Sequence, residues 1–563
     1  MVIDSKNVES SNNMEFTWAN PYSSIRLPVF GRNLVSTSQP LAAQAGLYIL
    51  QKGGNAIDAA IAAAATLMVV EPVSNGLGSD CFAIVWDGKN LQGLNASGVA
   101  PSVWSPEYFS KRYGHDAHGL ANRPMRGWDT VTVPGALAGW QALHERFGSL
   151  PMDTLLEPAI RTAHDGYVLP LVVAKKWASA VPDLYEQPGF AQAFMPNGHA
   201  PNTGEVFRFS GAARALEKIA RDGIRDFYEG EIGQAIANFS AVCGGAMRIN
   251  DLASYRPQWT DTISQELRAL DGQRYSVHEI PPNGQGVGAL MALGILQHFN
   301  LSQFEVDGAD SQHLQIEAMK LAFADIYQYV ADPSTMDVSA EEMLQSDYLA
   351  DRARQIDMRQ AKQYTHGMPS VGGTVYLTTA DQQGCMVSFI QSNYMGFGSG
   401  VVVPGWGISL QNRGYGFSTN PKSPNVVSGG KRPFHTIIPA FLMREEAGRW
   451  QPQMSFGVMG GDMQPQGHVQ TIVRMLSYGQ QPQAACDAPR WKVNRDFSID
   501  TEAGMQAETL QELISRGHVQ RTIQDPYMDF GAGQFIWRLS DNSADIRYVA
   551  ASDPRRDGLV AAF

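Results

Sequence analysis

The sequence predicts a fold that combines strands with helices. Residues 374–380 and 386–392 are rich in β-branched residues and flank the turn Asp381-Gln382-Gln383-Gly384, a pattern typical of two strands joined by a turn. Residues 55–70 are rich in alanine and apolar on nearly all sides, which indicates a helix in the interior. The segment Phe82–Trp86 follows a turn-rich loop and indicates a further strand.

Other segments carry clear local signals. Residues 1–30 contain Ser, Asn and Pro without periodicity, so we expect a flexible lead-in. A helix is predicted from near Pro40 to the pair Gly53-Gly54, which ends it as a C-terminal glycine cap. Another helix is predicted over residues 312–330. Its polar residues read as core and surface positions of one amphipathic helix: His313, Glu317, Lys320 and Asp325.

Composition and charge exclude several classes of protein. The chain has 563 residues, of which 44% are hydrophobic and 17% charged, which is ample for a large core. Its 55 acidic and 43 basic residues give a formal net charge of -12, which argues against a nucleic-acid-binding protein. The longest apolar run, Ile57–Val70, is too short to span a bilayer. Scattered cysteines and an N-terminus without a signal segment predict a reducing, cytoplasmic location.

Thr374 is the candidate nucleophile. Gly372 and Gly373 precede it, and glycine tolerates backbone geometries in which the Thr374 hydroxyl reaches its own preceding carbonyl. An N-to-O acyl shift followed by hydrolysis would cut Gly373–Thr374 and leave a free α-amine beside the hydroxyl, a nucleophile with its own base. The polar residues 358–373 would then be a linker that moves away after the cut. A Gly-Gly-Thr run before a strand is ordinarily just a loop entering a sheet, so the wider sequence has to decide.

Motifs elsewhere in the chain support this chemistry. They are Gly372–Tyr376, Phe397–Gly405, Asn412-Arg413, Lys431-Arg432-Pro433 and Gly460-Gly461, preceded by Lys52–Ala56 and Val133–Trp140. In this order they resemble the γ-glutamyltranspeptidase family, whose members are self-cleaving N-terminal-nucleophile hydrolases. The resemblance runs from about Val35 to the C-terminal region.

The resemblance implies a fold and a domain organisation. The expected fold is α+β, a four-layer αββα sandwich with two stacked, mostly antiparallel sheets flanked by helices. One catalytic unit would consist of a large subunit, residues 31–373, and a small subunit, residues 374–563, cut from one precursor. A dimer of such heterodimers is one candidate assembly. The expected partners are a small-molecule amide and water, with no cofactor, metal, nucleic acid or membrane.

The resemblance also assigns roles around Thr374. The α-amine of Thr374, which titrates at about 8, would accept the hydroxyl proton. Ser392 matches a family threonine that hydrogen-bonds near the new N-terminus, although a plain strand hydroxyl is an equal alternative. Gly460 and Gly461 match the family's oxyanion segment, where glycine lets backbone N–H groups approach the substrate closely.

The positions that hold an α-amino acid head in the family differ in this chain. Ser97 replaces the arginine that binds the α-carboxylate, and Gly416 replaces the aspartate that binds the α-amine. Arg413 stands where glutamine is common, and a guanidinium suits bidentate carboxylate binding. The residues expected to contact the substrate are Ser97, Tyr394, Asn412, Arg413, His435 and Thr436.

The expected activity is hydrolysis of a small, carboxylate-bearing amide through an acyl-Thr374 intermediate. An oxamate-like substrate is favoured because residues 431–436 and 460–466 resemble the branch that contains oxamate amidohydrolase. The alternative within enzymes is a γ-glutamyl hydrolase or transferase with replacement anchors. From another class, an uncut and inactive protein of the same fold remains open.

Two other patterns are weaker. Residues 284–289 fit the dinucleotide pattern G-x-G-x-x-G/A after a predicted strand, but Pro281-Pro282 interrupts the unit and no second βαβ unit is evident. The family has a Pro-Pro and Gly-Gly loop at this point, which borders the active site. His115, Asp116 and His118 cluster without zinc-like spacing, so a solvated loop is predicted there.

Overall fold

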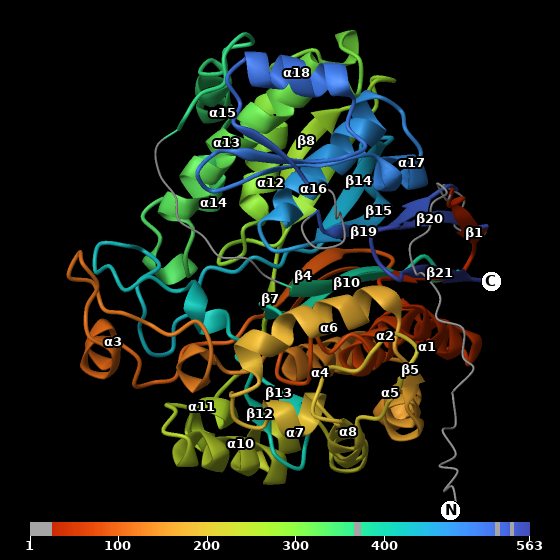
Figure 1. Cartoon of the computed structure of the whole chain (residues 1–563). Helices are drawn as coiled ribbons and strands as arrows, with labels where there is room; N and C mark the ends of the chain where they lie inside the picture. Colours follow the sequence, from red (N-terminus) through yellow and green to blue (C-terminus); the bar gives the residue numbers. More distant parts are fainter. Residues whose placement is uncertain (1–24, 365–372, 524–529, 541–544) are drawn as a thin grey trace, which may run out of the picture.

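The computed structural model describes residues 25–364, 373–523, 530–540 and 545–563, and two large antiparallel sheets lie face to face at its centre (Figure 1). In spatial order the first sheet contains β1 (Val29–Gly31), β20 (Tyr548–Ser552), β19 (Ala532–Arg538), β15 (Arg449–Met459), β14 (Ala440–Glu446), β9 (Arg274–Glu279) and β8 (Ile263–Arg268). The second contains β21 (Leu559–Ala562), β2 (Leu34–Thr37), β10 (Gly373–Ala380), β11 (Met386–Tyr394), β3 (Asp80–Trp86), β4 (Leu91–Ala96) and β7 (Gln258–Thr260).

Helices cover the outer face of each sheet. Against the second sheet lie α1 (Pro40–Gln51), α2 (Ala56–Val70) and α4 (Ala136–Phe147). Against the first lie α12 (Gly286–Leu296), α16 (Met463–Ile472) and α17 (Pro482–Asp487), with α13 (Ala309–Tyr329) packed on α12. The predicted four-layer αββα sandwich is therefore confirmed (Figure 1).

Smaller elements decorate the two helical layers. The remaining helices are α3 (Pro106–Tyr113), α5 (Met152–Asp165), α6 (Leu171–Leu184), α7 (Phe190–Phe194), α8 (Ser210–Asp222), α9 (Asp226–Glu229), α10 (Glu231–Val242), α11 (Ile249–Ala253), α14 (Ala340–Met343), α15 (Ser346–Ala353) and α18 (Ala507–Ser515), with short turns η1 (Trp128–Thr130), η2 (Leu301–Gln303), η3 (Pro333–Thr335), η4 (Arg413–Gly416) and η5 (Val473–Ser477). The small sheets pair β5 (Tyr167–Val168) with β6 (Val206–Phe207), β12 (Val402–Val403) with β13 (Ile408–Ser409), and β16 (Trp491–Val493) with β17 (Ile499–Glu502) and β18 (Gln520–Ile523).

Three apolar layers hold the sandwich together. One lies between the sheets and includes Phe82, Tyr376 and Phe441, and the other two lie between each sheet and its helices. Burial of apolar area, at about 25 cal/mol per Å², drives the stacking of such layers. Because β10 is covered by α2 on one face and by β15 on the other, every side chain described along it is buried.

Local signals explain the helices beneath the central strands. Gly53 has φ +91°, which glycine adopts without strain, and it ends α1 as predicted. Asn55 then starts α2 with a reciprocal capping box to Asp58. Every residue of α2 is buried, as its uniformly apolar sequence predicts.

The two predicted subunits are interleaved in both sheets. In the second sheet β10, from the predicted small subunit, pairs with β2 from the predicted large subunit, and β11 pairs with β3. In the first sheet β14 pairs with β9, and β1 pairs with β20. A cut at Gly373–Thr374 would therefore leave both chains hydrogen-bonded to each other.

Two expectations differ from the structure. The predicted lead-in, residues 1–30, lies largely outside the described residues, but its end belongs to β1, which is paired over Val29–Gly31. Helix α13 is not amphipathic, because its residues from Ser311 to Ile326 are buried. It is covered by α12 and by α18 from different sides, so its polar residues lie in the interior.

No helix within the described residues has both the length and the apolar character needed to cross a membrane.

Candidate functional site

Thr374 lies beside an irregularity between the central strands of the second sheet. Gly373 pairs with Tyr394 whereas Val375 pairs with Gln391, so β11 has one extra residue opposite Thr374. Such bulges occur often next to active sites, where they redirect a side chain. Tyr394 itself has φ +77°, an uncommon conformation for a residue with a side chain. Thr374 therefore lies at the register shift in the hydrogen-bond ladder between β10 and β11.

The Thr374 hydroxyl has two polar neighbours. The Ser392 hydroxyl lies 3.1 Å from it, and the N–H of Tyr394 donates to Ser392 Oγ at 2.8 Å. The Gln464 amide donates to the Thr374 hydroxyl at 3.5 Å, while the Gln464 carbonyl accepts the N–H of Ile438 at 2.9 Å. The structure therefore brings the predicted Ser392 to the predicted nucleophile and adds Gln464, which the sequence analysis did not single out.

The glycine pair predicted to bind an oxyanion forms the turn between β15 and α16. Gly460 has φ +123° and Gly461 has φ +61°, both in the region that favours glycine. Among the described residues, neither N–H group donates a hydrogen bond, so both are available to a ligand. Gln464, in the first turn of α16, links this turn to Thr374.

Arg413 is completely buried behind Tyr394. Its guanidinium lies 4.0 Å from the centre of the Tyr394 ring, and its Nη1 donates to the Thr436 hydroxyl at 2.9 Å. Its Nε and Nη2 have no hydrogen-bond partner within the described residues. Burial lowers the pKa of Arg413 to about 10, with opposing contributions from Tyr394 and acidic neighbours, so the side chain stays charged at neutral pH.

Both ring nitrogens of His435 form hydrogen bonds with other groups of the protein. Its Nδ1 accepts the N–H of Ile437 at 3.3 Å, so its Nε2 carries the proton and donates to Asp80 Oδ2 at 3.1 Å. Burial lowers the pKa of His435 well below its usual range, and burial raises the pKa of Asp80 to about 7 despite the charge of Arg413. His435 is thus placed to orient the segment that carries Thr436.

Two further predicted contact residues also have internal partners. The Ser97 hydroxyl donates to Asn95 Oδ1 at 2.7 Å, and the Asn283 amide donates to Ser97 Oγ at 3.2 Å. The side-chain oxygen of Asn412 accepts the N–H of Met395 at 3.1 Å. The side-chain NH2 group of Asn412 donates to the backbone carbonyl of Met125, also at 3.1 Å. Both residues support loops around the site, and a direct role in substrate binding stays a prediction for each.

The glycine-rich loop after β9 braces this site. Gln285 donates through its amide to the carbonyls of Thr436 at 2.6 Å and Gly461 at 3.0 Å, and its N–H donates to the His435 carbonyl at 3.0 Å. Strand β9 lies in an antiparallel sheet, not in a βαβ unit. Sequence reasoning placed this loop at the border of the site but missed Gln285, Gln464 and Asp80, because a single polar residue in a glycine-rich or apolar run shows no periodic signal.

Comparisons with known proteins identify the family of this chain. A family model described as Gamma-glutamyltranspeptidase matches residues 42–563. The chain belongs to the γ-glutamyltranspeptidase family. It is 34% identical to the glutathione hydrolase-like YwrD proenzyme of Bacillus subtilis over 94% of this chain and 98% of that protein. It is 33% identical to the oxamate amidohydrolase proenzyme of Klebsiella pneumoniae, over 93% of this chain and 97% of that protein.

The structure is also similar to solved structures, one of which is an acylase. The crystal structure of a cephalosporin acylase from Bacillus halodurans has 45% sequence identity and a TM-score of 0.89, covering 98% of this chain and 99% of that one. The recognition of the family and the expectation of a hydrolase are therefore confirmed. The predicted cleavage segment lies partly in residues 365–372, outside the described residues, so the cut remains a proposal.

The histidine and aspartate cluster at residues 115–118 lies on the surface of this member of the γ-glutamyltranspeptidase family. His115, Asp116 and His118 are exposed, and Asp116 accepts the N–H groups of His118 and Leu120 in a tight turn. Within the described residues a different group, His313, Glu317 and His518, has ligand atoms within 4.8 Å of one another. This buried group lies on the outer side of the first sheet, where α13 packs on α12.

Proposed function

We propose that this chain is a self-cleaving amidohydrolase whose N-terminal nucleophile is Thr374, and that it hydrolyses a small amide bearing a carboxylate. The single observation that carries the substrate class is Arg413, a fully buried cation with two guanidinium nitrogens unpartnered within the described residues. A buried charge is costly unless it is paired and hydrogen-bonded. A substrate carboxylate would supply both missing interactions in the fork geometry that a guanidinium favours.

The proposed maturation uses the Thr374 hydroxyl first. Oγ attacks the Gly373 carbonyl carbon, the C–N bond breaks as the Thr374 nitrogen takes up the proton, and an ester joins Gly373 to Oγ. Water then hydrolyses the ester, which leaves a carboxylate on Gly373 and a free α-amine on Thr374. The bulge opposite Thr374 and the hydrogen bond to Ser392 support this role, because they hold the hydroxyl at the strand start.

The proposed turnover repeats the attack on substrate. The α-amine accepts the proton of Oγ, Oγ attacks the amide carbonyl, and the tetrahedral oxyanion receives hydrogen bonds from the Gly460 and Gly461 N–H groups. The amine leaves with a proton, and water then hydrolyses the acyl-Thr374 ester. The unpartnered N–H groups of the glycine turn and its link to Thr374 through Gln464 support this assignment.

The identity of the acyl group follows from charge. An α-amino acid head needs both a cation for its carboxylate and an anion for its amine, and Ser97 and Gly416 supply neither at the positions that the family uses. We therefore favour a carboxylate-bearing acyl group without an α-amine, such as the oxalyl group that oxamate would transfer to Thr374 with release of ammonia. The similarity to an oxamate amidohydrolase and to a cephalosporin acylase supports this class. A γ-glutamyl substrate remains the second candidate because a glutathione hydrolase-like relative is equally similar.

Self-cleavage is tested directly. The wild-type chain should run as two bands on a denaturing gel, and the smaller band should begin Thr-Val-Tyr-Leu on N-terminal sequencing. Thr374→Ala should remain a single band without hydrolase activity, because it lacks the attacking oxygen. Another N-terminus would move the nucleophile, and an uncut wild type would favour the inactive-homologue alternative.

A side-by-side substrate screen tests the acyl group. Oxamate, glutaryl amides, glutathione and a γ-glutamyl anilide are compared at equal concentration with fully cleaved enzyme. The α-amine-free amides should have the higher kcat/KM. If a γ-glutamyl compound were the best substrate, the proposal that Arg413 selects a carboxylate without an α-amine would be contradicted.

We also propose a cytoplasmic location and an assembly from two chains of one precursor. The location is supported by four cysteines that are all unpaired. The assembly is supported by the proenzyme names of the relatives.

A further inference from the structure

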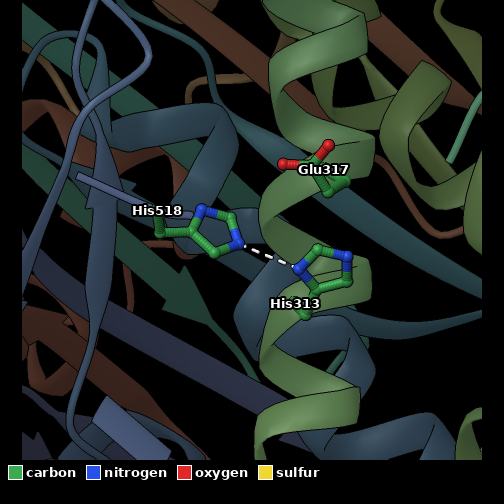
Figure 2. Close-up of side chains that lie close together, drawn as sticks. All are labelled: His313, Glu317 and His518. Atoms are coloured by element: carbon green, nitrogen blue, oxygen red, sulfur yellow. Dashed lines mark hydrogen bonds between the residues drawn. The ribbon is translucent and has the colours of Figure 1, made fainter. Parts of the chain in front are cut away.

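A buried polar cluster lies on the outer side of the first sheet, away from Thr374. It consists of His313, Glu317 and Lys320 on α13 and of His518, which follows α18, and we call it the α13 cluster. Figure 2 shows His313 and Glu317 projecting from the same helix toward His518. Each of the four residues is at most 3% exposed. Burying so many polar groups is costly unless all are hydrogen-bonded.

The hydrogen bonds define the proton positions in the α13 cluster. His313 Nε2 lies 2.9 Å from the Asp357 carbonyl, which only accepts, so Nε2 carries the proton. His313 Nδ1 then accepts from His518 Nε2 at 2.9 Å (Figure 2), and His518 Nδ1 accepts from Lys320 Nζ at 3.3 Å. Burial lowers the pKa of both histidines, which agrees with two neutral rings.

Lys320 argues against a metal in this cluster. Its ammonium donates to Glu317 Oε1 at 2.9 Å as well as to His518, so a cation already neutralises the carboxylate. A metal bound by His313, Glu317 and His518 would have to displace this ammonium and break the bond between the two rings. The proximity of the three ligand atoms therefore has a different explanation.

The outward hydrogen bonds of the α13 cluster go to one stretch of chain, residues 357–364. Glu317 Oε2 accepts the N–H of Lys362 at 3.1 Å and the hydroxyl of Tyr364 at 3.0 Å. Lys320 donates to the Lys362 carbonyl at 3.4 Å, and His313 donates to the Asp357 carbonyl. The carbonyl of Arg516, two residues before His518, accepts the N–H of Ala361 at 2.7 Å.

This stretch is separated by residues 365–372 from Gly373, the first residue of the bond that is proposed to be cut. It is held by α13 from the predicted large subunit and by the Arg516 carbonyl from the predicted small subunit. On the other side of residues 365–372, Gly373 is held in β10 by its pairing with Tyr394. Hydrogen bonds therefore hold the described chain on each side of residues 365–372, and holding both sides in place raises the chance that the Gly373–Thr374 bond reaches a reactive geometry.

We propose that the α13 cluster is a docking site for residues 357–364 and that docking positions the Gly373–Thr374 bond for self-cleavage. The inference rests on the proposed function, because it assumes a cut at that bond. The cluster side chains are positioning residues, since none of them contacts Thr374 in the described structure. The linker predicted over residues 358–373 is therefore tethered at its start.

Tyr364→Phe tests the proposal with the smallest change. It removes one hydroxyl from the Glu317 carboxylate at a half-buried position. The matched control is Tyr348→Phe, which removes an equivalent hydroxyl bond of 2.8 Å to Asp325 near the other end of α13. Each chain is made by cell-free translation, and the fraction cut is followed over time on a denaturing gel.

The half-time of cleavage should lengthen by about tenfold or more for Tyr364→Phe, the loss expected for a hydrogen bond to a charged group. It should change less than about twofold for Tyr348→Phe. The melting temperatures of the two variants should match, and kcat/KM per fully cut molecule should equal that of wild type in both. These results would separate positioning from general destabilisation.

Several outcomes would overturn the proposal. If wild type cuts itself and Tyr364→Phe cuts at the same rate, the docking role is refuted but the proposed function is not. If Tyr348→Phe is slowed as much as Tyr364→Phe, the slowing comes from lower stability and not from docking. Stoichiometric zinc in the purified protein that is lost in His518→Gln would make the cluster a metal centre. A wild type that never cuts would refute the proposed function and this inference together.

Discussion

At the scale of single residues, Arg413 is the most informative side chain. It pairs with a tyrosine face and one hydroxyl, but it has no carboxylate at hydrogen-bond distance within the described residues. The nearby acids contribute through their charge, and Asp80 is already bonded to His435. A rigid, pre-placed guanidinium of this kind favours one orientation of a planar anion.

Arg413→Lys should raise KM for the preferred carboxylate amide by about tenfold or more, with a smaller effect on kcat. An ammonium keeps the charge but cannot form the planar fork, and hydrogen bonds to charged groups contribute about 1.5–3 kcal/mol each. Steady-state kinetics of fully cut enzyme provide the measurement. Arg352→Lys, at an ion pair with Asp325 that includes none of the predicted site residues, is the control and should leave KM unchanged. Unaltered kinetics in Arg413→Lys would remove this residue from the substrate site.

At the scale of elements, the turn between β15 and α16 joins the first sheet to the helix that contacts Thr374. Its two glycines have φ angles that side chains rarely adopt, and the helix that follows carries Gln464 to Thr374. The Gln285 side-chain amide donates a hydrogen bond to the Gly461 carbonyl of the same turn. The turn is therefore rigid and its N–H groups are preorganised.

Gly461→Val should lower kcat strongly while the protein remains folded. A β-branched side chain at φ +61° would shift the turn, and loss of one oxyanion donor costs about 2.7–4 kcal/mol of transition-state stabilisation. Gly448→Val is the matched control, because Gly448 has φ +76° in the turn at the other end of β15 and no atom within 4 Å of its added Cβ. Equal turnover in a folded Gly461→Val protein would exclude this turn from the site.

At the scale of the whole molecule, the two predicted chains form one unit. Both sheets contain strands from both predicted chains, and the apolar layers between sheets and helices contain residues from each. Neither predicted chain could bury its own strands alone, since β10 and β11 lie between β2 and β3. The cut is thus expected to change the chain ends without opening the sandwich.

After cleavage, the fragments of residues 1–373 and 374–563 should elute together in size-exclusion chromatography without denaturant. They should separate only when the sandwich unfolds, so the loss of co-elution in urea should coincide with the loss of far-UV circular dichroism. Fragments that separate in plain buffer would contradict the interleaved arrangement.

Much of the fold was predictable from short stretches of chain. The strands around Asp381–Gly384, the two helices before Val70 and the glycine cap at Gly53 appear as predicted. The four layers came from the family resemblance, since no local pattern specifies how sheets stack. The polar interior of α13 was missed because the elements that cover both sides of it lie far away in the sequence.

The candidate site divides in the same way. Thr374 and the glycine pair were predicted from motifs, and the structure places Ser392 and Gln464 at hydrogen-bond distance from the Thr374 hydroxyl. The hydrogen bonds of Ser97 with Asn283 and of His435 with Asp80 could not be predicted, because each pair is far apart in the sequence.

The sequence by itself determined several of the elements, the candidate nucleophile and the absence of the family's charged anchors at positions 97 and 416, because each depends on residue types at neighbouring positions. Only the tertiary structure decided which polar groups are satisfied. It leaves Arg413 with open donors and gives Glu317 three donors from Lys320, Lys362 and Tyr364. Hydrogen bonds are short-ranged and directional, so their partners are set by packing between segments far apart in the chain.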